Sequence, residues 1–168
     1  MRLMTHGPAA PEARTMHVLV VDDHPLIRAG LEGVLNASDD IRVVGTAADG
    51  VGAVELARWF LPDVVLMDVS MPGGDGITAT RRMQELQRPP AVVVLTSSCT
   101  AALVEEVFAA GAVGYLLKDM PPGRLGPSLR GIYDGRPPID PRAARILTRL
   151  RRRRNAVDGS TAEQRSAV

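Results

Sequence analysis

The sequence contains only one cysteine, Cys99, so no disulfide can form within the chain, and a reducing cytoplasm is the expected setting. No apolar run approaches the roughly 20 residues that a helix needs to cross a bilayer. Residues 1–15 lack the apolar core of a signal peptide and are rich in proline, alanine and glycine. We therefore expect a cytoplasmic protein that does not enter a membrane and has a disordered leader over residues 1–15.

Acidic and basic residues are unevenly distributed, although the net charge of the 168 residues is only +1. Residues 1–135 carry 11 basic and 16 acidic side chains, a net charge of −5. Residues 136–168 carry 9 basic and 3 acidic side chains, a net charge of +6. The two segments are therefore expected to have different electrostatic roles.

Short apolar runs rich in valine predict the strands of the fold. They do not alternate between apolar and polar residues, and this is typical of strands that are covered on both faces of a parallel sheet. The five runs are Val18–Val21, Ile41–Thr46, Val64–Met67, Ala91–Leu95 and Val113–Leu117.

Amphipathic stretches of helical length separate the apolar runs. They cover Pro25–Ala37, Gly50–Phe60, Ile77–Leu86 and Ala101–Ala110. The alternation of strands and helices predicts a three-layer α/β domain with right-handed crossovers. In such a domain we expect the chemistry at the carboxyl ends of the strands.

The C-terminal part of the chain departs from this regular pattern. A last helix is expected over residues 121–133, but Pro127 would cost about 3 kcal/mol inside a helix. The helix is therefore expected either to begin late, near Gly126, or to be kinked. A short helix is expected over Pro141–Leu150, and we interpret Arg151–Arg154 as a solvated basic linker rather than as a contact for phosphate backbones.

Polar side chains stand where four of the predicted strands end. Because the carboxyl ends of parallel strands meet at one edge of a sheet, these side chains are expected to lie close together. They are Asp22 and Asp23 after the first run, Asp68 after the third, Thr96 and Ser97 after the fourth, and Lys118 after the fifth.

The residue types at this edge suit phosphoryl transfer. Three crowded carboxylates repel one another unless a cation lies between them, and oxygen ligands favour a hard cation such as Mg²⁺. A lysine and a threonine hydroxyl supply a charge and a hydrogen-bond donor for phosphoryl oxygens. A carboxylate that the metal does not consume can act as a nucleophile and become an acyl phosphate.

Each of these residues also has a plain structural interpretation. Asp22 or Asp23 could cap the next helix, Thr96 could do the same further along the chain, and Lys118 could be solvated. The coincidence of all four strand ends favours a shared site.

The motifs together resemble the receiver domain of two-component response regulators. They are Asp22-Asp23, the run DVSMP over Asp68–Pro72, Asp75-Gly76, Thr96-Ser97, Tyr115 and Lys118-Asp119. The segments DDHPLIRAGL (Asp22–Leu31) and GYLLKD (Gly114–Asp119) further resemble the NarL/FixJ-like subfamily, which usually carries a LuxR-type helix-turn-helix output domain. The resemblance covers roughly Met16–Pro141. It implies a flavodoxin-like (βα)5 fold, a doubly wound parallel sheet with strand order 2-1-3-4-5.

The resemblance implies a phosphoacceptor and a magnesium site. Asp68 would take the phosphoryl group. Asp23, Asp68 and the backbone carbonyl of Ser70 would bind Mg²⁺ directly, and Asp22 would do so directly or through water. Lys118 would pair with the phosphoryl group.

The resemblance also implies a switch. Thr96 would move towards the phosphoryl group, and Tyr115 would turn inward as it moves. Ser97 is small, as the site requires for room around the incoming group. A phosphoryl group adds about −1.5 to −2 charge, so donors gain by moving onto it.

The implied function is a signalling module, not a metabolic enzyme: its only catalysis is its own Mg²⁺-dependent phosphorylation and dephosphorylation. A sensor histidine kinase would be the donor, a homodimer is possible, and DNA would be bound only through an output domain. We expect the receiver over residues 16–135 and a basic linker or tail over residues 136–168, with the output domain absent from this chain. The sequence leaves open a fragment of a longer regulator or a single-domain receiver.

Two other classes fit less well. Haloacid-dehalogenase-like phosphotransferases need a second aspartate two residues after the nucleophile, whereas here the pair is adjacent, and no nucleotide-binding glycine motif occurs. A pseudo-receiver that binds partners without phosphorylation would usually have lost an acid or the lysine, and both are present. The disturbed last helix is the only feature in its favour.

Overall fold

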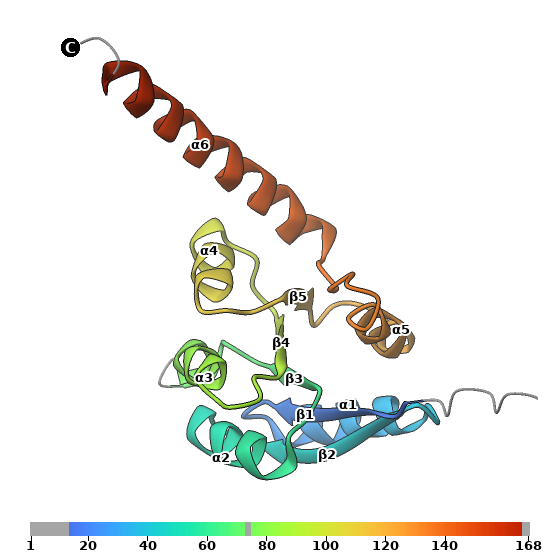
Figure 1. The fold of residues 1–168 in the computed structure, drawn as a ribbon. Coiled ribbons are helices and arrows are strands. Elements are labelled where there is room, and N and C mark those ends of the chain that lie inside the picture. The colour runs from blue at the N-terminus through green and yellow to red at the C-terminus, as the bar shows by residue number, and fades with distance from the viewer. Residues whose placement is uncertain (1–13, 73–74, 166–168) are drawn as a thin grey trace, which may run out of the picture.

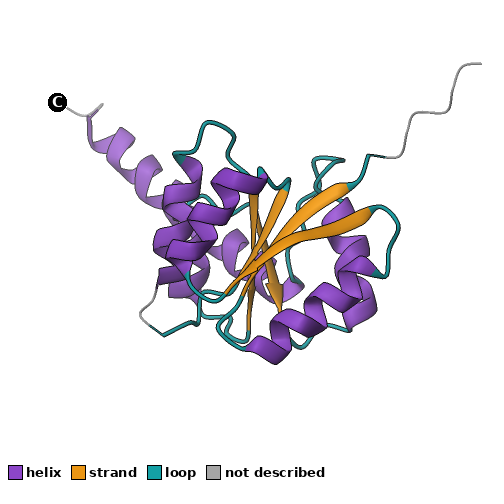
Figure 2. Cartoon of the chain, turned by 90° about the horizontal axis from the view of Figure 1, so that it is seen from below, coloured by secondary structure: helices purple, strands orange, loops and turns teal. Residues whose placement is uncertain are grey.

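A computed structural model describes residues 14–72 and 75–165, and only the backbone of Asp75 and of residues 154–165. Its centre is a sheet of five parallel strands in the order β2-β1-β3-β4-β5 (Figures 1 and 2). The predicted flavodoxin-like fold and strand order are therefore confirmed. The strands are β1 (Met16–Val21), β2 (Ile41–Ala47), β3 (Val64–Met67), β4 (Ala91–Thr96) and β5 (Gly114–Leu117).

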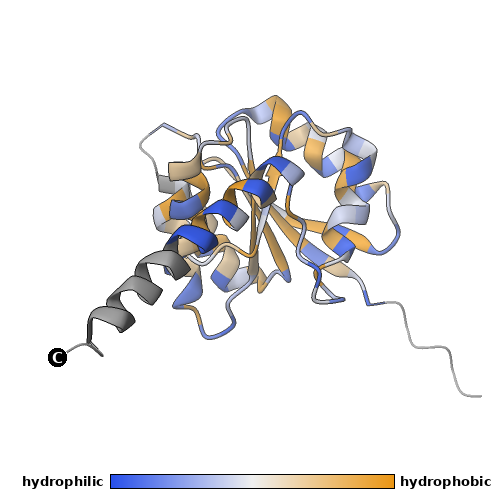
Figure 3. Ribbon diagram, turned by 90° about the horizontal axis from the view of Figure 1, so that it is seen from above, coloured by the Kyte–Doolittle hydropathy of each residue, from blue (hydrophilic) through white to orange (hydrophobic). Residues whose placement is uncertain are grey.

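The strands are apolar throughout because both faces of the sheet are covered. All residues of β3 and β5 are buried. Successive residues of β1 enter different hydrophobic clusters: Leu19 and Val21 face one cluster, and Val18 and Val20 face the other. This two-sided burial explains why the apolar runs do not alternate with polar residues. The hydrophobic colour in Figure 3 follows the strands accordingly.

Helices pack on each face through their apolar sides. The cluster with Leu19 contains Ala53, Met83 and Val104 from three successive helices, and the other cluster contains Leu35 and residues of the last sheet-covering helix. The helices are α1 (Pro25–Asn36), α2 (Gly50–Phe60), α3 (Asp75–Gln84), α4 (Ala101–Ala109) and α5 (Leu125–Arg130). Helices α2, α3 and α4 therefore cover one face, and α1 and α5 cover the other.

Helix α5 begins late, which is one of the two outcomes expected from its proline. A 3₁₀ turn, Pro122–Arg124, precedes it, and Pro127 is its third residue. The first N–H groups of a helix have no acceptor within the helix, so the donor that proline lacks is not needed there. Leu125 and Leu129 are buried and hold this short helix on the sheet.

The segment after α5 continues the domain. The N–H of Tyr115 donates to the carbonyl of Pro138 at 2.9 Å, and the N–H of Asp140 donates to the carbonyl of Tyr115 at 2.7 Å. Residues 138–140 thus lie along the free edge of β5, with Ile139 opposite Tyr115. Helix α6 (Pro141–Arg165) follows and extends away from the body past α4 (Figure 1).

Helix α6 is longer than the sequence indicated. The helix expected over Pro141–Leu150 has the predicted start but runs on through the four arginines at 151–154 to Arg165. Ala143 is fully buried, and Ile146 and Leu147 pack against the cluster on the α4 side. The first turns of α6 therefore belong to the folded body.

Two expectations concern the ends of the chain and membranes. The leader predicted over residues 1–15 lies outside the described residues, apart from Arg14 and Thr15. Within the described part of the chain, no helix has both the length and the apolar character that spanning a bilayer requires.

Candidate functional site

The polar residues predicted from the strand ends meet at one edge of the sheet. Asp22 and Asp68 directly follow β1 and β3, Thr96 ends β4, and Lys118 directly follows β5. Backbone hydrogen bonds extend the strand pairing by one residue beyond β3 and β5: Asp68 N–H donates to Val21 at 2.9 Å, and Lys118 N–H donates to Thr96 at 2.9 Å. These bonds fix where the functional side chains leave the sheet.

Lys118 joins two buried carboxylates. Its Nζ lies 2.6 Å from Asp22 Oδ2 and 2.7 Å from Asp68 Oδ2, although 96 and 50 residues, respectively, separate it from them. Asp22 and Asp68 are only 1% and 2% exposed. Burial acts to lower the pKa of Lys118, but its hydrogen bonds to both carboxylates outweigh burial and raise that pKa. The lysine is therefore a fixed positive charge.

The second oxygen of Asp68 is held by the backbone that follows it. Ser70 N–H donates to Asp68 Oδ1 at 2.8 Å. The carboxylate therefore has a defined orientation. The chain also passes very close at the start of α3, where a Cβ on Gly76 would collide with the carbonyl oxygen of Asp68. This close approach gives a physical reason for the glycine after Asp75.

Asp23 supplies the feature that fits a cation. Its Oδ1 is buried and has no hydrogen-bond partner, although His24 Nδ1 lies 2.9 Å away without the alignment of a hydrogen bond. Asp22 Oδ1 lies 3.4 Å from the same imidazole nitrogen, so ligand atoms of three adjacent residues lie together. A buried carboxylate oxygen without a partner, beside a second carboxylate, suits a hard cation such as Mg²⁺.

His24 lies at the start of α1. It is the residue before Pro25, the first residue of α1, and its side chain makes no capping hydrogen bond. The side chain is 66% exposed, and its backbone N–H donates to Asp22 Oδ1 at 2.9 Å. We therefore interpret His24 as a polar residue at a helix start rather than as a metal ligand.

A chain of hydrogen bonds leads from Asp68 to Tyr115. Ser70 Oγ lies 2.9 Å from Thr96 Oγ1, which also accepts from Ser98 N–H at 3.3 Å. Tyr115 Oη then donates to the carbonyl of Ser98 at 2.6 Å. The predicted switch residues Thr96 and Tyr115 are thus connected to the site through two serines.

Tyr115 is turned inward in this structure. It is fully buried, and its ring stacks on Phe108 of α4 with a centroid distance of 6.4 Å. Burial raises the pKa of its phenol to about 12. Its hydroxyl is therefore held by the protein and not by solvent.

A second connection, which no sequence pattern indicates, joins Asp119, the neighbour of Lys118, to α6. The guanidinium of Arg142 donates to both carboxylate oxygens of Asp119 at 2.7 Å and to Asp140 Oδ1 at 3.0 Å. These hydrogen bonds lower the pKa values of both carboxyl groups and raise that of the guanidinium. The motif Lys118-Asp119 is therefore tied to the C-terminal helix.

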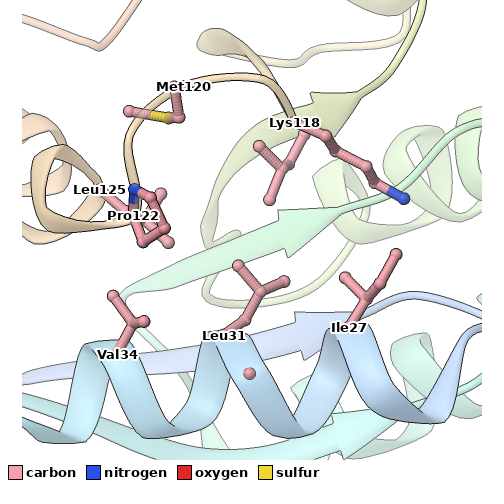
Figure 4. Close-up of a pocket in the computed structure, with 9 residues that line it drawn as sticks. Ile27, Leu31, Val34, Lys118, Met120, Pro122 and Leu125 are labelled. Carbon is pink, nitrogen blue, oxygen red and sulfur yellow. The ribbon is translucent and has the colours of Figure 1, made fainter.

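An apolar pocket of about 280 Å³ lies between α1 and the start of α5, beside the aliphatic stem of Lys118 (Figure 4). The aliphatic stem of Lys118 lines it, while the nitrogen points away from it. Leu31 and Val34 of α1 face Met120 and Leu125 across the pocket. No acid or hydroxyl group lines this pocket, so the pocket itself offers no nucleophile and no metal ligand.

Comparison with known proteins identifies the family. The model of the response regulator receiver domain matches residues 18–130. The chain is 40% identical over 137 residues to transcriptional regulatory protein LiaR of Bacillus subtilis, with 81% of this chain and 65% of LiaR covered. It is 38% identical over 133 residues to oxygen regulatory protein NreC of Staphylococcus carnosus, with 79% of this chain and 61% of NreC covered.

Solved structures agree. A LuxR-family two-component response regulator from Aurantimonas is 33% identical, with a TM-score of 0.75 and coverage of 82% of this chain and 98% of that one. The receiver domain of the putative regulator NarL from Mycobacterium tuberculosis is 36% identical, with a TM-score of 0.69 and coverage of 73% and 99%. The chain belongs to the response regulator receiver family. Its relatives place it in the NarL/FixJ-like subfamily, and it spans somewhat under two-thirds of the length of LiaR and NreC.

Proposed function

We propose that this chain is a phosphorylation-controlled receiver in which Asp68 accepts a phosphoryl group from a sensor histidine kinase. One observation carries the proposal: Asp68 is buried at the sheet edge with Lys118 Nζ 2.7 Å from its carboxylate, and the same ammonium lies 2.6 Å from the buried carboxylate of Asp22. A carboxylate oxygen of Asp68 attacks phosphorus, the P–O bond forms, and the P–N bond of the donor phosphohistidine breaks. The product is an acyl phosphate, and the histidine of the donor leaves with the electron pair of the broken bond.

The magnesium ligands in this proposal are Asp23, Asp68 and the Ser70 carbonyl, with Asp22 direct or through water. The unpartnered Asp23 Oδ1 supports this assignment. The bound ion supplies positive charge for the phosphoryl oxygens and neutralises the crowded carboxylates. The protein itself contributes the Lys118 ammonium. In this proposal the ammonium exchanges its two carboxylate partners for oxygens of the phosphoryl group.

Thr96 and Tyr115 form the proposed switch. The Thr96 hydroxyl is 2.9 Å from Ser70 Oγ, and it exchanges this partner for a phosphoryl oxygen when Asp68 is modified. Tyr115 is connected to Thr96 through Ser98, so its inward position is coupled to the state of the site. Response regulator receivers are not metabolic enzymes in general, and the catalysis proposed here is confined to the chain's own phosphorylation and dephosphorylation.

The output in this proposal is transcription regulation, because the relatives are named as transcriptional and response regulators. A receiver over residues 16–135 and a basic segment over 136–168 would act in the cytoplasm, with sequence-specific DNA binding by an output domain. A homodimer is one state in which such a regulator would act. One structural neighbour is a structure of two RcsB dimers bound to two parallel DNAs.

The test is the intact mass of the purified chain after incubation with acetyl phosphate and Mg²⁺. We expect a gain of one phosphoryl group. The gain should be absent with EDTA and in Asp68→Asn, and it should persist in Asp39→Asn, which removes an exposed carboxylate elsewhere. No gain in a folded chain, with either acetyl phosphate or a partner kinase as donor, would favour a pseudo-receiver.

A further inference from the structure

The orientation of α6 is fixed by contacts on one side. Ala143 is fully buried, and Ile146 and Leu147 pack against the cluster beneath α4. Leu150 lines a groove with Phe108 and Val113, residues at the end of α4 and just beyond it. These residues share one helix face by their spacing of three and four. The opposite face of α6 must therefore point away from the body.

That outer face carries arginines. Arg145, Arg149 and Arg152 follow one another at spacings of four and three, opposite the buried face, and all three are exposed. We call these three residues the arginine stripe. None of them forms an ion pair with the described part of the chain, whereas Arg142 at the base of the helix is engaged by Asp119 and Asp140. No acidic residue of α6 lies within four positions of any of the three, so the helix offers them no neutralising partner at the spacing where side chains meet.

We propose that the arginine stripe binds the phosphate backbone of double-stranded DNA without reading its sequence. Three guanidinium groups spread over about 10 Å of helix can each engage a phosphate with two parallel hydrogen bonds. Such contacts position a protein on a duplex and release counterions. The proposal goes beyond the phosphorylation function and revises the expectation that DNA is met only through an output domain.

Other polyanions fit the stripe less well. A helix that lies on an anionic membrane inserts its apolar face, but the apolar face of α6 is already packed on the body. The relatives are regulators of transcription, so double-stranded DNA is the polyanion that such a chain is expected to meet. The net charge of −5 over residues 1–135 disfavours anions on the rest of the domain and favours binding at the basic segment that carries the stripe.

The experiment is a salt titration of the binding of the whole chain to a fluorescent random-sequence duplex, followed by anisotropy. Each phosphate contact adds about 0.9 to the slope of log affinity against log salt, so three contacts weaken binding roughly 40-fold between about 50 and about 200 mM salt. In the combined variant Arg145→Gln, Arg149→Gln, Arg152→Gln, the fall of log affinity with log salt should become shallower by about 2.7. A matched variant, Arg42→Gln, Arg58→Gln, Arg88→Gln, removes the same charge from exposed positions elsewhere and should keep the slope.

Several outcomes would overturn the proposal. These are no binding by the unmodified chain, an equal loss of slope in both variants, or binding to anionic lipid vesicles as tight as to the duplex. Circular dichroism is the folding control, and both variants should keep the helical signal of the unmodified chain. Asp68→Asn should bind the duplex like the unmodified chain, so the result does not depend on whether Asp68 is phosphorylated.

Discussion

At the scale of single residues, Lys118 is the cation at the carboxylate edge of the sheet. It is the cation that compensates Asp22 and Asp68, both of which are buried. Removing one partner of a buried ion pair leaves an uncompensated charge, which costs about 3 kcal/mol or more. The same ammonium stands where phosphoryl oxygens would arrive.

We predict that Lys118→Met lowers the free energy of unfolding by about 3 kcal/mol and abolishes phosphoryl gain from acetyl phosphate. Chemical denaturation and intact mass measure the two effects. Mg²⁺ should raise the melting temperature more in this variant than in the unmodified chain, because the carboxylates then lack their lysine. Arg124→Met, which removes an exposed cation, should change none of these quantities.

Tyr115 has a testable ionisation. Its buried phenol has a pKa of about 12, above the ordinary value of about 10. The folded state holds the proton more tightly than the unfolded state, so the stability that this group contributes is complete below pH 10 and is lost as pH rises towards 12. In Tyr133→Phe, which leaves Tyr115 as the only tyrosine, phenolate absorbance read directly after a pH jump should show a midpoint near 12. A midpoint near 10 in chain that is still folded would contradict the buried position.

At the scale of elements, α5 shows how position decides the cost of a proline. Pro127 stands in the first turn, where the missing N–H has no role. Pro127→Ala is therefore expected to lower the free energy of unfolding by less than about 1 kcal/mol, through the added freedom of the unfolded chain. Leu129→Ala, which empties a fully buried position of the same helix, should cost about 2 kcal/mol or more in the same denaturation experiment. A stabilisation of about 3 kcal/mol by Pro127→Ala would instead indicate a proline inside a continuous helix.

The base of α6 is held by Arg142, and Cys99 reports on that contact. Cys99 is the only thiol, is partly buried in the cluster that Ile146 also contacts, and has a pKa raised by burial and by Asp140. We predict that Arg142→Gln speeds labelling of Cys99 by a thiol reagent, because the first turns of α6 then separate more often from the body. Arg136→Gln breaks an exposed pair with Asp134 and should leave the rate unchanged. Equal rates in both variants would mean that the Arg142 contacts do not hold the helix.

At the scale of the whole molecule, the sheet and the site edge could be predicted because both depend on local patterns. Each buried strand is an apolar run, and in a parallel sheet the residue after each run must lie at the same edge. Asp68 and Lys118 were therefore predictable neighbours despite the 50 residues between them. Their roles in phosphorylation stay predictions until they are measured.

The remaining features depend on contacts that no local pattern encodes. The Ser70–Thr96 hydrogen bond and the inward Tyr115 are choices of side-chain conformation made by the packed site. The Arg142–Asp119 contact joins residues 23 apart, on either side of α5. The length of α6 exceeds the prediction because four successive charges indicate a solvated linker, whereas arginine is also a good helix former.

The central claim is that Asp68 is the residue that carries the phosphoryl group. The most direct test treats the phosphorylated chain with borohydride, which reduces an acyl phosphate to an alcohol, and maps the product by peptide mass spectrometry. The account predicts homoserine at position 68 and intact aspartate at Asp22 and Asp23. Reduction at either of those two residues, or at none, would contradict the assignment of Asp68.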